Sequence, residues 1–191
     1  MKLTDGMLLY HGSYAEIDQI DLNRGSSGRD FGKGFYLTSD FEQAKSFLRS
    51  SVRKAEEKGL LPDHQKYGYV TVFRYCGKEN DLSVYEFASA DKEWLWYISS
   101  NRREKLAEIL KKNLKEELYR ADILIGKVAN DNTNRVLAAY LNGLFGDIVS
   151  EEAVNIAISQ LIPEKLTDQV FFRTEKAIAG LQKAEVYRYD I

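Results

Sequence analysis

The 191-residue chain carries 27 basic and 29 acidic residues, so its net charge of −2 demands neither a nucleic acid nor a membrane, while leaving room for a local basic patch. Cys76 is its only cysteine, which excludes an intrachain disulfide and a cysteine-rich zinc site and fits a reducing compartment. No signal-peptide pattern and no apolar run of ~18 residues is present. We therefore expect one cytoplasmic domain over residues 1–191, with no membrane partner.

The N-terminal region predicts two short strands separated by a loop. An apolar run at Met7–Tyr10 indicates a buried strand that ends in a loop at His11–Ser13. Glycine and polar residues over Asn23–Lys33 predict a second loop, and Phe35–Thr38 then reads as a strand.

A long helix is expected next, because apolar residues recur at helical spacing from Phe41 to Ala55. Ser39 or Asp40 can cap it, and Gly59 ends the pattern. The strands expected after this helix are Tyr69–Tyr75 and Leu82–Phe87.

The rest of the chain alternates helices with a few strands. The expected helices are one capped by Asp91, one carrying apolar residues from Leu106 to Leu118, and three over Thr133–Leu141, Ser150–Leu161 and Thr174–Leu181. The expected strands are Asp122–Gly126, Gln169–Arg173 and Glu185–Tyr189. The fold class is therefore α+β, with six or seven short strands.

Two segments combine small residues with groups that could bind a flat polar ligand. His11 follows the first strand, and Gly12 beside it would let a ligand reach the backbone N–H and C=O. Gly32-Lys33-Gly34-Phe35-Tyr36 permits close backbone approach and then offers an aromatic face. The alternatives are a strand-end histidine satisfied by backbone and a tight turn into a strand. The second segment has neither the Walker nor the G-x-G-x-x-G spacing.

Two later segments are weaker candidates. Polar residues from Ala129 to Thr133 follow a buried strand, and they either cap the next helix or line a cleft. Asp168 and Gln169 begin a very apolar strand, whereas Glu175 suits the first turn of the following helix. No H-E-x-x-H or G-x-S-x-G motif is present.

Taken in order, Leu9–Ser13, Phe31–Thr38 and the strand at Gln169 resemble the ADP-ribosyltransferase superfamily, on its diphtheria-toxin-like or poly-ADP-ribose-polymerase-like side. The chain is more similar still to a bacterial branch of unknown function. The segments that carry this second resemblance are Asp30–Thr38, Glu93–Leu95 with Asn101–Arg102, Asp122–Asp131 and Gln169–Leu181. The resemblance implies a split β-sheet core with a helical middle insertion.

The resemblance also implies roles for individual residues, with NAD as substrate and no metal. His11 would hydrogen-bond the adenosine ribose, the Gly12 backbone would hold the nicotinamide amide, and Tyr36 would stack on the nicotinamide ring. Gln169 stands where many relatives have a catalytic glutamate, which removes a negative charge from the reacting centre. The NAD-binding residues expected are Tyr10, His11, Gly12, Ser13, Gly34, Tyr36 and Asn130, and the catalytic ones are His11, Tyr36 and Gln169.

The function expected from the resemblance is mono-ADP-ribosyl transfer from NAD to an unknown macromolecule, with release of nicotinamide. Genes of the bacterial branch often lie beside a small partner gene, which implies a toxin–antitoxin or defence role with an antitoxin protein. Because Gln169 is neutral, a non-catalytic module that binds NAD or ADP-ribose and acts through a partner stays open. An NAD glycohydrolase, which uses water as acceptor, is the third alternative.

Overall fold

A computed structural model describes residues 1–61, 64–77, 81–128, 131–162 and 166–191 as two β-sheets with helices packed on both. The three-stranded sheet has the order β1-β3-β7, formed by Leu8–Ser13, Tyr67–Tyr75 and Leu181–Asp190. The four-stranded sheet has the order β2-β6-β5-β4, formed by Phe35–Leu37, Asp168–Phe172, Ile123–Lys127 and Val84–Glu86. These findings confirm the α+β class.

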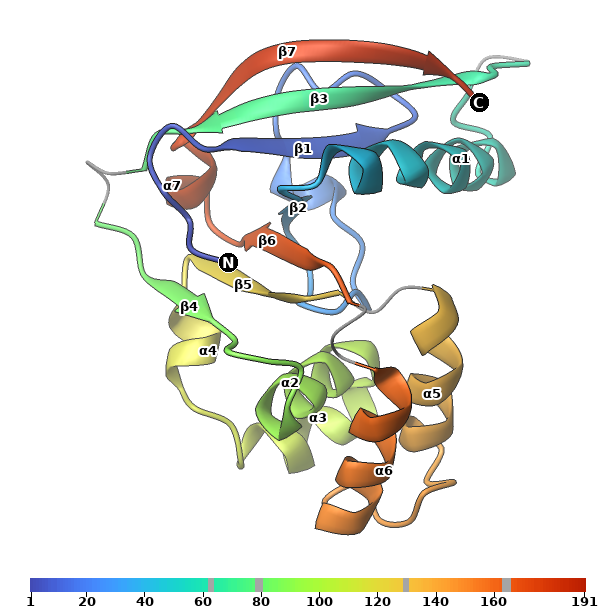
Figure 1. Cartoon of the computed structure of the whole chain (residues 1–191), viewed down its shortest axis with the longest axis vertical. Coiled ribbons are helices and arrows are strands. Elements are labelled where there is room, and N and C mark those ends of the chain that lie inside the picture. The colour runs from blue at the N-terminus through green and yellow to red at the C-terminus, as the bar shows by residue number, and fades with distance from the viewer. Residues whose placement is uncertain (62–63, 78–80, 129–130, 163–165) are drawn as a thin grey trace.

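The sheets lie one above the other, and the helices divide between them (Figure 1). Helix α1 (Phe41–Glu57) packs against the three-stranded sheet. Most of the other helices gather on the far side of the four-stranded sheet. They are α2 (Lys92–Arg102), α3 (Glu104–Lys111), α4 (Glu117–Arg120), α5 (Asp131–Leu141) and α6 (Glu151–Leu161). The short α7 (Glu175–Ile178) connects β6 to β7. Among the described residues, no helix has the length and apolarity needed to span a membrane.

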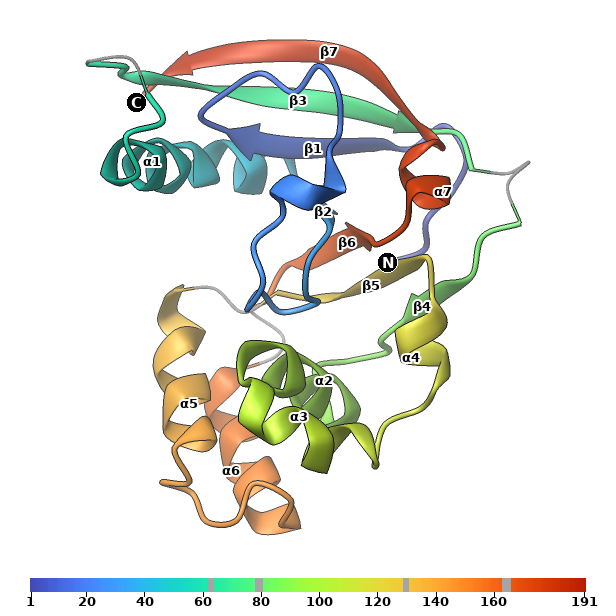
Figure 2. The ribbon, with the colours of Figure 1, turned by 180° about the vertical axis from the view of Figure 1, so that it is seen from behind.

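Among the described residues, one isolated β-bridge joins the two sheets. Tyr10 of β1 and Thr38, just after β2, exchange backbone hydrogen bonds of 2.8 and 3.0 Å, and beyond this bridge the strands diverge. A core containing Leu9, Phe35 and Phe172 fills the space between the sheets on one side of the bridge. The segment between β1 and β2, including a 3₁₀ turn at Leu22–Arg24, runs beside the gap between the sheets (Figure 2), and its Ile17, Ile20 and Leu22 pack against this core. The divergence therefore leaves an opening that this segment borders.

Several predicted boundaries are confirmed by capping contacts. Asp40 caps α1 by accepting hydrogen bonds from the backbone N–H groups of Glu42 and Gln43. Ser150 caps α6 in the same way through the N–H of Ala153. Each side-chain oxygen satisfies a donor that the first helical turn leaves unpaired.

Other predictions were wrong at element ends. Strand β1 continues through His11–Ser13, which were expected in a loop, because β3 pairs with it along its whole length. The expected helix over Leu106–Leu118 divides into α3 and α4. Helix α7 stops at Ile178, and Leu181 already belongs to β7, because pairing with Tyr75 in β3 extends the last strand toward it.

Candidate functional site

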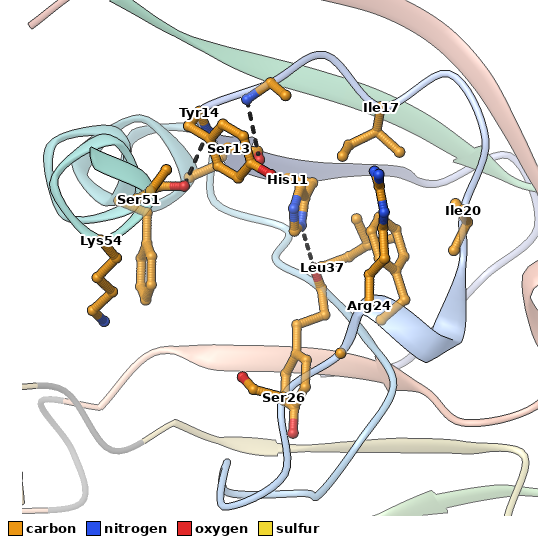
Figure 3. A pocket seen from close by; sticks show the side chains of 18 of the residues that line it. His11, Ser13, Tyr14, Ile17, Ile20, Arg24, Ser26, Leu37, Ser51 and Lys54 are labelled. Atoms are coloured by element: carbon orange, nitrogen blue, oxygen red, sulfur yellow. Dashed lines mark hydrogen bonds between the residues drawn. The ribbon is translucent and has the colours of Figure 1, made fainter. Parts of the chain in front are cut away.

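A cavity of about 340 Å³ opens where the two sheets diverge. Its walls come from β1, β2, the segment that joins them, one side of α1 and the start of β6, as seen in Figure 3. Its volume is in the range of small-molecule sites. The expected site residues that line it are Tyr10, His11, Gly12, Ser13, Gly34, Tyr36 and Gln169. Asn130, the remaining one, lies outside the described residues.

His11 is held at the centre of this cavity as a hydrogen-bond acceptor. Its ring lies 4.7 Å from the ring of Phe35, and Nδ1 donates a 2.9 Å hydrogen bond to the backbone carbonyl of Tyr36. Burial lowers the pKa of His11, and the charge of Arg29 acts in the same direction, although the hydrogen bond to Tyr36 opposes them. The ring is therefore neutral near pH 7 with its proton on Nδ1, which leaves Nε2 as an acceptor for a ligand hydroxyl.

Gly12 presents backbone polar groups to the cavity. Tyr10 directs its N–H and C=O to Thr38, away from β3. Backbone groups two residues apart in an antiparallel strand point to the same side, so those of Gly12 also point off this edge, beyond the bridge. A Cβ on Gly12 would lie 2.0 Å from the carbonyl oxygen of Ala44, so glycine is required for α1 to pack on β1. Gly12 therefore allows α1 to pack on β1 and also offers its backbone N–H and C=O, a donor and an acceptor side by side.

Tyr36 is fixed by its own loop. Its hydroxyl donates a 2.6 Å hydrogen bond to the carbonyl of Gly32 and accepts one of 3.1 Å from the N–H of Phe31. The ring lies 4.8 Å from that of Phe171, and burial raises the pKa of the phenol far above its ordinary value. The hydroxyl therefore stays protonated, and Tyr36 serves the site through its ring rather than as an acid or base.

In the second segment, packing requires glycine at position 34 and backbone conformation favours it at position 32. A Cβ on Gly34 would lie 2.3 Å from the ring of Phe171 and 2.7 Å from the carbonyl oxygen of Phe172. Gly32 has a φ of +92°, a conformation that disfavours other residues. These positions let β2 lie directly on β6, which brings Tyr36 and Gln169 onto the same face of the four-stranded sheet.

That shared face follows from the register. Tyr36 pairs with Phe171, and Gln169 lies two residues before Phe171, so their side chains project to the same side. Gln169 is partly buried at the cavity wall, and its side-chain amide makes no hydrogen bond to any described residue. The amide is therefore available to a ligand.

The structure adds site residues that the sequence alone did not single out. They are Arg24 and Arg29 on the segment between β1 and β2, Phe47 and Lys54 on α1, and Lys58 at its C-terminal cap. Within the described parts of the chain, none of the four basic residues has a carboxylate partner. Arg24 and Arg29 could have been found from the sequence, because both lie in a glycine-rich loop.

The loop that carries Tyr36 is anchored to the helices below it. Oδ1 of Asp30 accepts a 2.6 Å hydrogen bond from Nε of Arg102 at the end of α2, and Nη2 of Arg102 forms an ion pair with the same oxygen at 2.5 Å. Asn101 donates a 3.0 Å hydrogen bond to the carbonyl of Asp30. Glu175, by contrast, lies in the first turn of α7 as predicted and does not line the cavity.

Comparison with known proteins identifies the family of the chain. Residues 7–182 match the family model described as protein of unknown function (DUF3990). Neither curated proteins nor solved structures gave a match. Because the match spans nearly all of the chain, the protein belongs to the DUF3990 family.

Proposed function

We propose that the protein is an ADP-ribosyltransferase that cleaves the nicotinamide–ribose bond of NAD and transfers ADP-ribose to a macromolecule. The observation that carries the proposal is the convergence of His11 and Gly12, Tyr36, and Gln169 on one cavity, from three separate strands. The two-sheet core, joined at one bridge, is the arrangement expected for such a fold.

Three parts of NAD, namely the nicotinamide carboxamide, a ribose and the pyrophosphate, have a matching group in the cavity. The nicotinamide carboxamide offers an NH₂ donor group and a C=O acceptor, which complement the outward C=O and N–H of Gly12. Nε2 of neutral His11 accepts a hydrogen bond from a ribose hydroxyl. The guanidinium groups of Arg24 and Arg29 suit the pyrophosphate, because both line the cavity and neither is neutralised by a described carboxylate.

Bond cleavage requires positive charge to build on the ribose as nicotinamide leaves with the bonding electrons. A site that stabilises this charge accelerates the reaction. The carbonyl oxygen of Gln169 supplies a dipole there, and Tyr36 packs against Phe171 and cannot ionise near pH 7. A dipole stabilises the charge less than a carboxylate would, so we expect slow mono-transfer rather than polymer synthesis.

The test is to incubate the protein with labelled NAD and separate fractions of cell lysate, nucleic acid and purified protein. The proposal expects nicotinamide release together with label on a macromolecule, both reduced at least 10-fold in His11→Ala. An absence of labelling in every fraction would contradict it. Free ADP-ribose with no labelled macromolecule would identify the glycohydrolase instead.

A binding module is the second candidate, and the neutrality of Gln169 favours it. Calorimetric titration with NAD separates the two, because saturable binding without any nicotinamide release supports the module. A role as a toxin restrained by a small antitoxin is a further proposal. It expects expression of the wild type to arrest bacterial growth and that of His11→Ala not to do so.

A further inference from the structure

One side of α1, with its C-terminal cap, forms a continuous track along the wall of the cavity that holds the proposed NAD site. Phe47, Ser50, Ser51, Lys54 and Lys58 all line the cavity and recur at helical spacing. With a rise of about 1.5 Å per residue, the track extends about 16 Å along the helix and its cap. Phe47 begins it beside Gly12, since a Cβ on Gly12 would lie 3.4 Å from the Cβ of Phe47.

The chemistry of the track changes along its length. Phe47 is 39% exposed, which leaves its ring available at the end nearest Gly12. Serine hydroxyls follow, and two exposed ammonium groups, those of Lys54 and Lys58, end it. No carboxylate belongs to the track, and the i,i+4 ion pair of α1, Arg53 with Glu57, uses residues that do not line the cavity.

The cavity thus has two pairs of basic side chains, which lie in different places. Figure 3 shows Lys54 beneath α1 and Arg24 on the opposite side of His11. NAD carries one pyrophosphate, which Arg24 and Arg29 suit in the proposed function. Lys54 and Lys58 are left without an anionic partner among the described residues.

We propose that this track binds the acceptor and that the acceptor is a single-stranded nucleic acid, an inference that rests on the proposed function. The ring of Phe47 stacks on the base to be modified, and Lys54 and Lys58 contact phosphates along the strand. An acidic peptide would satisfy the lysines but would leave the exposed ring at the reacting end without a flat partner. A base in a duplex could not enter the cavity without being unstacked, so a single strand is favoured.

The transfer step balances without any further reagent. The C–N bond between nicotinamide and the ribose C1′ breaks, and its electron pair leaves with neutral nicotinamide. The lone pair of a nitrogen or oxygen on the base forms the new bond to C1′. The proton that this atom loses passes to water.

The first test measures binding without NAD, by fluorescence anisotropy of labelled single strands of about 12 nucleotides, as RNA and as DNA of the same sequence. The Lys54→Gln, Lys58→Gln double variant is expected to weaken binding at least 10-fold and to reduce the slope of log affinity against log salt by about 1.4. The control is Lys105→Gln with Lys112→Gln, which removes the same charge from exposed positions at α3 and is expected to change neither quantity.

A second pair of variants tests the aromatic contact. Phe47→Leu keeps an apolar side chain but removes the ring and is expected to weaken strand binding about 10-fold, whereas Phe47→Tyr retains binding. Equal losses in the two lysine double variants, or equal binding of a polyglutamate peptide, would overturn the inference. Strand binding without NAD binding would contradict only the proposed function, and NAD binding without strand binding only this inference.

Discussion

His11 provides a pH signature at the scale of a single residue. Its pKa in the folded chain lies below the ordinary 6.5, chiefly because the ring is buried, so the unfolded chain takes up a proton at higher pH than the folded one. The stability that this group contributes is therefore lost as pH falls through about 6.5. We predict that the free energy of unfolding, measured in urea, falls less between pH 7 and 5 in His11→Gln than in the wild type. Equal pH slopes would contradict the assignment.

Gln169 decides how fast the proposed reaction runs. A carboxylate at the same position would place a negative charge beside the developing positive charge on the ribose. We predict that Gln169→Glu raises the rate of nicotinamide release by up to ~10²-fold, and that Gln169→Leu lowers it about 10-fold. The measurement is chromatographic quantification of nicotinamide. A faster Leu variant would show that Gln169 does not face the reacting ribose.

Gly12 contributes both to the packing of α1 on β1 and to the candidate site. Alanine there would place a methyl group 2.0 Å from the carbonyl oxygen of Ala44, so α1 must move away from β1. We predict a loss of about 3 kcal/mol in the free energy of unfolding, measured with urea. Gly6→Ala is the control, because Gly6 has open space around its Cβ position and only its φ of +81° to oppose the change, which costs about 1 kcal/mol. Similar losses in both variants would contradict the packing role.

At the scale of elements, the ion pair between Asp30 and Arg102 joins the loop before β2 to the end of α2. Asp30 is 5% exposed and Arg102 is 21% exposed, so removing the arginine leaves a buried carboxylate without this partner. We predict that Arg102→Ala lowers the free energy of unfolding by about 3 kcal/mol and weakens NAD binding, because Tyr36 belongs to the anchored loop.

The control for this prediction is Arg53→Ala. Arg53 and Glu57 are 69% and 64% exposed, and such a pair contributes less than about 1 kcal/mol. Urea denaturation gives the stability and calorimetry the NAD affinity. An Arg102→Ala variant as stable as Arg53→Ala would show that the loop does not depend on this anchor.

The helices and strands could be predicted from the sequence where nearby side chains determine where they begin. Asp40 and Ser150 cap helices because a short polar side chain satisfies nearby N–H groups, and such a signal is local in sequence. The end of β1 was not predictable, since His11 to Ser13 become strand only through pairing with β3, about 60 residues later in the chain. Tertiary pairing overrode the local loop signal of Gly12 and Ser13.

The candidate site, likewise, could be predicted from the sequence only in part. The glycines and aromatic residues from Gly32 to Tyr36 mark a close backbone approach that is readable in one sequence. The contact of Arg102 with Asp30 was not readable, because it depends on how α2 packs. The track from Phe47 to Lys58 could have been found from its helical spacing, but only the fold shows that this side of α1 lines the cavity.

At the scale of the whole molecule, the net charge of −2 coexists with a cavity wall whose arginines and lysines have no carboxylate partner among the described residues. We predict that NAD affinity, measured by calorimetry, falls as potassium chloride is raised from low to physiological concentration, because salt screens exposed charges. The fall should be smaller in Arg24→Gln with Arg29→Gln. A salt-independent affinity in the wild type would remove these arginines from the proposed pyrophosphate site.

The central claim is that NAD binds between β1 and β2, and a crystal structure of the protein with NAD tests it most directly. We predict that the nicotinamide amide pairs with the backbone N–H and C=O of Gly12, with Gln169 within ~3.2 Å of the nicotinamide ribose. NAD bound outside this cavity, or bound with its nicotinamide ribose turned away from Gln169, would contradict the account.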